Sequence, residues 1–224
     1  MKKALIPASQ QPSRGNLVTR RRFVGVLAVG LASVRSSRSL AETRISTPRQ
    51  TEGPFYPDRL PLDRDNDLLR VGERTATARG RETHLRGRIV GVDGAPLSGA
   101  LVEIWQVDAN GVYLHSADRH ARRDAGFQGY GRYLTDASGE YFFRTIKPVP
   151  YPGRTPHIHF KVTPVSRATF TTQCYVQGEP LNARDAVLNS IGDPAARALL
   201  IVPFVPVSES PASVLNARFD IVLA

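Results

Sequence analysis

The chain has 224 residues, enough for one well-buried core, and its 41% hydrophobic and 22% charged content excludes a wholly disordered protein. Of its 30 basic side chains, eight lie in the first 41 residues, which contain no acidic ones. The remaining residues contain 22 basic and 20 acidic side chains, a net charge of about +2. The net charge of +10 therefore does not indicate a nucleic-acid-binding surface.

Residues 1–41 have the form of an export signal. Thr19-Arg20-Arg21-Arg22-Phe23 precedes an apolar run over residues 24–34, which is too short to span a bilayer as a helix. This arrangement resembles a twin-arginine signal, so we expect export by the twin-arginine machinery to the periplasm or beyond, with a mature chain starting near Glu42. An uncleaved anchor and a disordered basic tail are the alternatives. The only cysteine, Cys174, cannot form an internal disulfide, so the chain does not require an oxidising compartment.

Residues 42–82 are rich in Arg, Asp, Thr and Pro and show little periodicity, which predicts an extended N-terminal arm that packs along a core. From residue 83 the pattern changes to short apolar runs separated by turn residues such as Asp93-Gly94. We expect strands over residues 85–92, 100–107, 141–146, 157–163, 171–176 and 219–223. Their length and spacing predict an all-β fold, an antiparallel β-sandwich that occupies residues 83–224.

Helix signals are confined to the C-terminal part of the chain. Asn182 is a candidate cap for a helix over residues 183–191. Asp193-Pro194 is a favourable cap and first-turn pair for a second helix over residues 195–201. Both helices are short, so they are expected as an excursion before the last strand.

The chemistry of the chain begins with His157 and His159. In a strand, residues two apart share a face, so both imidazoles would point one way and Ile158 the other. Two imidazoles side by side suit a transition metal, although an isolated pair of this kind is more often a surface or core feature. Tyr151 lies in a stiff proline-rich loop just upstream, and Tyr113 follows an expected strand; either tyrosine could simply pack against the core.

Several further segments accompany these residues in a fixed order. They are residues 51–56 (TEGPFY), 101–106 (LVEIWQ), 111–113 (GVY), 146–152 (IKPVPYP), 154–160 (RTPHIHF) and 172–175 (TQCY). Together they resemble the intradiol ring-cleavage dioxygenases, most closely the protocatechuate branch of that family. The resemblance extends from about residue 51 to the closing residues 218–223, and it rests on the order of the motifs more than on any one of them.

The resemblance implies an iron(III) centre in which Tyr113 and Tyr151 are phenolate ligands and His157 and His159 complete the set. A free phenol has a pKa near 10, so only a strongly acidic cation would hold two phenolates at neutral pH, and hard anionic oxygens favour iron(III) over zinc or copper. The implied reaction takes a catechol-type ring and dioxygen and opens the ring between its two hydroxyls, giving a cis,cis-muconate-type diacid.

Catalytic roles are implied for three side chains. Tyr151 would also act as a base, Arg154 would stabilise charge that develops on the ring, and Gln173 would support the site next to the metal. Arg154 could instead be a salt-bridged surface residue, and Tyr56 could line the pocket or only close the arm over the core. Gly153 stands where protocatechuate enzymes carry a tryptophan, which would open the mouth of the pocket. The family also suggests a homo-oligomer.

Two other kinds of protein remain possible from the residues alone. A non-catalytic, transthyretin-like binding or carrier domain would account for the strand-turn-strand segment at residues 94–104 and would need no metal. A zinc hydrolase would need a third nitrogen or carboxylate ligand. His84, His115 and His120 lie at no spacing that indicates such a ligand.

Overall fold

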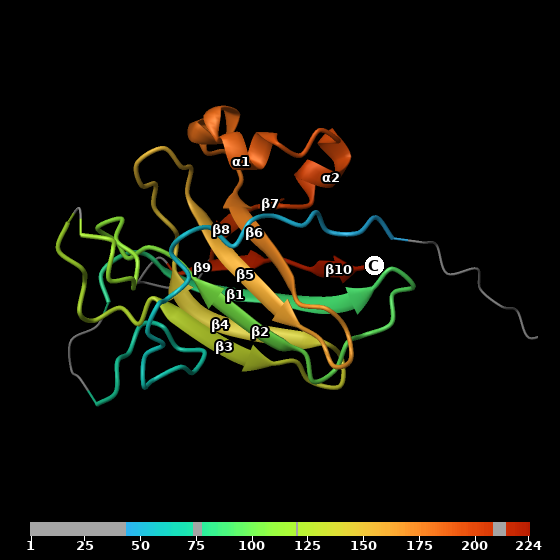
Figure 1. Cartoon of the computed structure of the whole chain (residues 1–224), viewed down its shortest axis with the longest axis horizontal. Helices are drawn as coiled ribbons and strands as arrows, with labels where there is room; N and C mark the ends of the chain where they lie inside the picture. The colour runs from blue at the N-terminus through green and yellow to red at the C-terminus, as the bar shows by residue number, and fades with distance from the viewer. Residues whose placement is uncertain (1–43, 74–77, 120, 208–213) are drawn as a thin grey trace, which may run out of the picture. The chain divides into compact units, whose positions relative to one another are not determined.

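The computed structural model of the chain describes residues 44–73, 78–119, 121–207 and 214–224 (Figure 1). The expected export signal at residues 1–41 lies outside these ranges. Among the described residues there is no helix of sufficient length and apolar character to cross a membrane.

Two β-sheets form the fold. In the first, β1 (Glu82–Gly91) pairs along one edge with β4 (Glu140–Ile146) and along the other with β9 (Leu215–Arg218) and β10 (Ile221–Leu223), and β8 (Phe204–Pro206) pairs with β9. The second sheet has the order β3 (Tyr130–Leu134), β2 (Leu101–Trp105), β5 (His157–Thr163), β6 (Phe170–Val176) and β7 (Ile201–Val202). The predicted mostly-β sandwich is confirmed, with one refinement: the pairs β1–β9, β1–β10 and β6–β7 run parallel.

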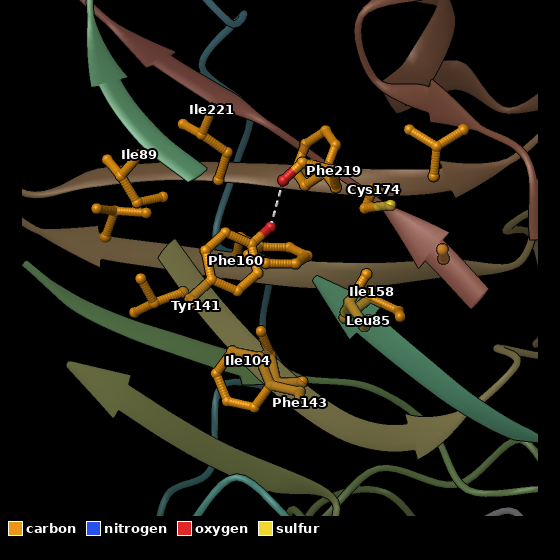
Figure 2. Packing of buried hydrophobic residues seen from close by; sticks show 14 of the residues in the cluster. Leu85, Ile89, Ile104, Tyr141, Phe143, Ile158, Phe160, Cys174, Phe219 and Ile221 are labelled. Carbon is orange, nitrogen blue, oxygen red and sulfur yellow. Dashed lines mark hydrogen bonds between the residues drawn. The ribbon is translucent and has the colours of Figure 1, made fainter. Parts of the chain in front are cut away.

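The hydrophobic core lies between the two sheets (Figure 2). Phe160 of β5 contacts Tyr141 of β4, with ring centroids 5.8 Å apart, and Phe219, which precedes β10, at 5.0 Å. The Tyr141 hydroxyl donates to the carbonyl oxygen of Phe219 (Figure 2), so the one polar atom of this buried ring is satisfied. Each fully buried aliphatic or aromatic side chain contributes about 1.5–3 kcal/mol, which makes this interface the main source of stability.

Strand β5 has buried side chains on both faces. Ile158 and Phe160 point into the main core, as Figure 2 shows. His157 and His159 are each 2% exposed and point to the opposite face. A second buried cluster, formed by Trp105, Val107, Tyr113 and Tyr130, lies on that face. The alternation predicted from the sequence therefore separates the core from the histidine pair.

The arm before β1 binds to both sheets. The backbone N–H of Thr47 donates to Val222 of β10 at 2.9 Å, and that of Gln50 donates to Thr171 of β6 at 2.9 Å. In Figure 1 this segment is the blue trace that runs along the sandwich. It delivers Phe55 to the histidine face of the second sheet.

The helical excursion differs from the prediction. It consists of a 3₁₀ turn η1 (Pro180–Arg184) and two short helices, α1 (Ala186–Asn189) and α2 (Pro194–Ala198). In Figure 1 the two helices lie above β7, which they precede in the chain. Asn182 is not a cap, because Pro180 starts a 3₁₀ turn and the extended backbone of Asp185 ends it; Asp185 instead caps α1 by accepting from the N–H of Leu188. Asp193 caps α2 as predicted. Strands β3, β7, β8 and β9 were not predicted.

Candidate metal centre

Three atoms with lone pairs converge at the histidine face of β5. The hydroxyl oxygen of Tyr113 lies 3.3 Å from Nε2 of His157 and 3.0 Å from Nε2 of His159, and the two Nε2 atoms are 3.1 Å apart. Tyr113 is brought there by the loop that follows β2, in which the buried Asp108 carboxylate accepts from the N–H groups of Asn110 and Val112. Three side chains from two parts of the sequence thus surround one point.

The hydrogen bonding of His157 fixes which of its nitrogens is free. Its Nδ1 lies 2.7 Å from the carbonyl oxygen of Thr155, which can only accept, so Nδ1 carries the proton. Nε2 of the neutral ring therefore presents a lone pair to the point where the three atoms meet. Holding the second nitrogen of a histidine by a carbonyl is the usual arrangement for a metal ligand.

Both imidazoles are neutral near pH 7. Burial, followed by the charge of Arg154, lowers the pKa of His157 to about 3. Burial, followed by the charges of His157 and Arg154, lowers the pKa of His159 well below its usual range. A neutral imidazole is the form that binds a metal.

Tyr113 is protonated unless a cation is close. Burial raises the pKa of Tyr113 well above 10, and the neighbouring Tyr151 raises it further. The phenol has one proton for two imidazoles, so a full hydrogen bond to one Nε2 atom leaves the other without a donor. Hydrogen bonds alone thus satisfy this cluster poorly, whereas a cation would use all three converging lone pairs.

The spacing of the three atoms fits a single cation. Two ligand atoms bonded at about 2.1 Å and separated by about 90–110° lie about 3.0–3.4 Å apart. The observed separations of 3.0, 3.1 and 3.3 Å agree with this range. Among the described residues no three His, Cys, Asp or Glu side chains cluster as a metal site, so the tyrosines are needed to complete one.

Tyr151 joins the cluster from the proline-rich loop. Its ring lies 5.2 Å from the ring of Tyr113 and 5.6 Å from that of His157. Its hydroxyl oxygen is 3.4 Å from Nη1 of Arg154. The loop closes on itself through a hydrogen bond from the N–H of Arg154 to the carbonyl of Tyr151, with Gly153 in the left-handed region at φ +80°.

Arg154 and Gln173 lie together beside the converging atoms. Nη2 of Arg154 donates to Oε1 of Gln173 at 2.6 Å, and Gln173 is fully buried on β6. The Arg154 side chain, 15% exposed, also forms an ion pair with the buried Asp185, so it is salt-bridged, but partly buried and next to Tyr151. Two residues of this network were missed by the sequence analysis. Tyr175 shares a strand face with Gln173 and donates to its Oε1 at 2.9 Å, so the two-residue period of the strand could have identified it. Nothing in the sequence indicates Asp185.

Aromatic rings enclose the cluster. Trp105, opposite His159 in the β2–β5 ladder, stacks on that imidazole at 4.7 Å with an interplanar angle of 10°. Phe55 of the arm stacks on Tyr113 at 5.1 Å. A Cβ placed on Gly53 would lie 3.6 Å from Cε1 of His159, so the backbone of the arm also covers the cluster.

Tyr56 attaches the N-terminal arm to β2 of the second sheet. Its hydroxyl donates to the buried Glu103 carboxylate at 2.8 Å, and Tyr130 donates to the same oxygen. Tyr56 also contacts Trp105 edge-on, at 5.1 Å. It supports the site from outside and is not one of the converging groups.

A hollow of about 200 Å³ opens beside the cluster. Its lining residues are Tyr151, Gly153, Arg154, Thr155, Leu181, Arg184 and Asp185. A Cβ on Gly153 would meet no atom within 4 Å, so there is open space around this lining residue of the hollow.

The other described histidines are not among the converging groups, although His115 packs edge-on against Phe55 at 5.7 Å. His84 contacts Glu82 at 3.3 Å on β1, and His115 accepts from the N–H of Ala117. His120 is outside the described residues. Neither His84 nor His115 supplies the third ligand that a zinc hydrolase would need.

Comparison with known proteins gives the family. The family model described as "Dioxygenase" matches residues 51–224. The β chain of protocatechuate 3,4-dioxygenase from Burkholderia cepacia is 37% identical over 205 residues, with 84% of this chain and 86% of that protein covered. Catechol 1,2-dioxygenase 2 from Acinetobacter lwoffii is 31% identical over 182 residues, with 70% of this chain and 63% of that protein covered.

Comparison with solved structures gives the same family. The dioxygenase domain of a dioxygenase–carbohydrate-binding protein fusion from Streptomyces sp. SirexAA-E matches with a TM-score of 0.60 and 32% identity, covering 80% of this chain and 98% of that one. Catechol 1,2-dioxygenase from Acinetobacter sp. ADP1 matches with a TM-score of 0.62 and 27% identity, covering 80% of this chain and 62% of that one. These relatives do not favour a non-catalytic binding domain, and enzymes of their family use iron. The chain therefore belongs to the dioxygenase family, as an intradiol ring-cleavage enzyme.

Proposed function

We propose that this enzyme binds iron(III) through Tyr113, Tyr151, His157 and His159 and opens catechol-type rings between their two hydroxyls. The observation that carries the proposal is the convergence of Tyr113 Oη with two imidazole Nε2 atoms within 3.3 Å, beside Tyr151. Family membership supports the reaction class.

The donor set supports the choice of metal. Two phenolate oxygens and two imidazoles are hard donors with two negative charges, which favour iron(III) over zinc or copper. When bound, the ferric ion would supply the Lewis acidity that keeps phenols and a catechol deprotonated at neutral pH. Burial and the neighbouring Tyr151 raise the pKa of Tyr113, so this residue depends on such a cation to become a phenolate.

The protein would contribute proton transfer and charge stabilisation. Tyr151 Oη would accept a proton from a substrate hydroxyl, and Nη1 of Arg154, 3.4 Å away, would stabilise negative charge at that position. Gln173 holds the other end of the guanidinium at 2.6 Å. Phe55, stacked on Tyr113, excludes water from one side of the cluster.

The relatives support the substrate class. Their names include protocatechuate, catechol and hydroxyquinol dioxygenases, all acting on rings with two adjacent hydroxyls. We therefore propose a small aromatic diol and dioxygen as substrates and a cis,cis-muconate-type diacid as product. Gly153 and the hollow beside Tyr151 favour a mouth that accepts larger ring substituents.

The first test is the visible absorption spectrum of the purified, iron-loaded protein, before and after anaerobic addition of catechol. A tyrosinate-to-iron(III) band that shifts with catechol, followed by oxygen uptake and diacid formation in air, is the expected result. A protein that binds no iron when reloaded, and stays colourless, would refute the proposal and leave a binding domain as the better explanation.

We also propose that the chain is exported through the twin-arginine machinery and cleaved near Glu42, and that it forms a homo-oligomer. The support for export is the sequence of residues 1–41. Mass spectrometry of exported protein should show an N-terminus near Glu42, and replacing Arg20 and Arg21 by lysine should retain the chain in the cytoplasm. Exported protein that still carries residues 1–41 would contradict the cleavage. Light scattering tests the oligomer.

A further inference from the structure

Asp185 is a buried acid that lies outside every sequence motif of the proposed centre. It lies between η1 and α1, and its side chain is 0% exposed. Its Oδ2 accepts from Nε of Arg154 at 2.8 Å and from the N–H of Thr155 at 2.9 Å, while Oδ1 accepts from the N–H of Leu188 at 2.9 Å. Both carboxylate oxygens thus accept hydrogen bonds, and Oδ2 accepts from two residues of the loop that follows Tyr151.

These contacts determine where the guanidinium of Arg154 points. Asp185 holds Nε and Gln173 holds Nη2, the latter at 2.6 Å. Since the guanidinium is planar and rigid, fixing two of its nitrogens fixes the third. The third, Nη1, lies 3.4 Å from Oη of Tyr151.

The same carboxylate also acts on the histidine side of the centre. The N–H of Thr155 donates to Asp185, and the carbonyl of Thr155 lies 2.7 Å from Nδ1 of His157. One acid therefore restrains two consecutive residues, each of which contacts a proposed ligand.

We infer that Asp185 is a positioning residue for ring cleavage: it holds Arg154 so that Nη1 faces Tyr151, and holds Thr155 so that His157 keeps its orientation. The inference rests on the proposed function of this centre. It extends the active site into the helical excursion after β6, which contains none of the proposed ligands.

The main alternative is that Asp185 only caps α1. Asp193 provides a matched control, because it caps α2 in the same way, accepting from the N–H of Ala195 at 2.9 Å, but is exposed and bonds within its own helix. Asn is as good a cap as Asp, so either Asp→Asn change alters helix stability little. Only Asp185→Asn also replaces a charged acceptor of the guanidinium with an amide.

The test measures kcat and KM for catechol, anaerobic catechol binding by absorbance, iron content and thermal unfolding on the iron-loaded enzyme. We expect Asp185→Asn to lower kcat by at least about 10-fold while iron content and catechol binding stay within about 2-fold of wild type. Asp193→Asn should leave kcat within about 2-fold. Equal kcat values for the two variants would overturn the inference.

A double-mutant cycle separates positioning from general destabilisation. If Asp185 acts on turnover largely through Arg154, then Asp185→Asn should change kcat less than about 3-fold in an Arg154→Gln background. If the fold-losses in kcat of the two single variants multiply in the double variant, Asp185 does not act through Arg154. Should Asp185→Asn fail to fold, Asp185→Glu, which keeps the charge but displaces the carboxylate by one methylene, takes its place; wild-type kcat in that variant would overturn the inference.

Failure of the proposed function is recognised separately. Wild-type enzyme that binds iron but cleaves no catechol, protocatechuate or hydroxyquinol would refute the function itself, and with it the inference. Wild-type cleavage with an unaffected Asp185→Asn variant would refute the positioning role alone.

Discussion

Replacing Tyr113 by phenylalanine removes one oxygen atom from the proposed centre and leaves its ring in place. The ring is 1% exposed and stacked on Phe55 at 5.1 Å, so the packing should survive. In the wild-type protein the Tyr113 hydroxyl lies 3.3 Å from His157 Nε2 and 3.0 Å from His159 Nε2. The phenylalanine variant loses this hydrogen-bond partner of the two imidazoles. An unsatisfied buried group costs about 1–3 kcal/mol, and for a domain of this size that is a fall of about 2–12 °C in the Tm of the iron-free protein.

The effect on iron should be larger than the effect on stability. Changing a residue that merely supports a metal ligand typically weakens metal binding about 10–100-fold, so losing a ligand should weaken it at least that much. The assay is a chelator challenge followed by elemental analysis, with thermal unfolding measured in parallel.

Tyr130→Phe is the matched control. Tyr130 is also 1% exposed and belongs to the same buried cluster, but its hydroxyl donates to Glu103 at 2.5 Å instead of facing the histidines. It should lose a comparable amount of stability and keep its iron. If both variants retain iron equally after the challenge, Tyr113 is not a ligand.

Three further predictions concern catalysis, the core and pH. Tyr151→Phe should fold but lose turnover at least about 100-fold; wild-type oxygen uptake would refute its role as ligand and base. Gly87→Ala should cost more than about 3 kcal/mol in the free energy of unfolding, because its Cβ would lie 1.9 Å from the carbonyl oxygen of Phe219, whereas Gly192→Ala, with open space around it, should be neutral or slightly stabilising. Denaturant titration that finds the two alike would contradict this. Because burial lowers the pKa of His157 from 6.5 to about 3, the unfolded state of the iron-free protein binds protons more readily between these values. Its stability should be full above about pH 6.5 and decline towards pH 3, and a constant Tm across that range would be inconsistent with a buried neutral imidazole.

Local sequence patterns predicted the longer strands well. Strands β1, β2, β4, β5 and β6 carry clear apolar runs bounded by turns, and each was placed within a few residues. Strand β3 was missed because its run contains Gly131, where a Cβ would lie 2.6 Å from Leu68 and 2.7 Å from Asp65. That glycine is explained only by the arm packed against it. Strands β7 to β9 are two to four residues long, too short for a clear apolar run, and β7 and β9 pair with β6 and β1, which are distant in sequence.

The residues of the site were predicted from motif order, and the structure brings the predicted set together. Gln173 and Arg154, 19 positions apart, meet at 2.6 Å. Asp185 could not be found in this way, because its role depends on a 3₁₀ turn that folds back over the loop after Tyr151. The position of Asn182 misled the helix prediction for the same reason: its side chain bonds to Thr155 and Val176 instead of capping a helix.

The alternation along β5 has an evolutionary consequence. His157 and His159 share a strand with the core residues Ile158 and Phe160, so a mutation in this strand disturbs chemistry and folding together. The hollow beside Tyr151 is built differently, since its lining residue Leu181 is 40% exposed and belongs to a turn outside both sheets. Selection can therefore alter exposed positions of this turn, such as Leu181, at little thermodynamic cost. A directed-evolution library aimed at new substrates should randomise Leu181 and leave β5, Asn182 and Asp185 unchanged.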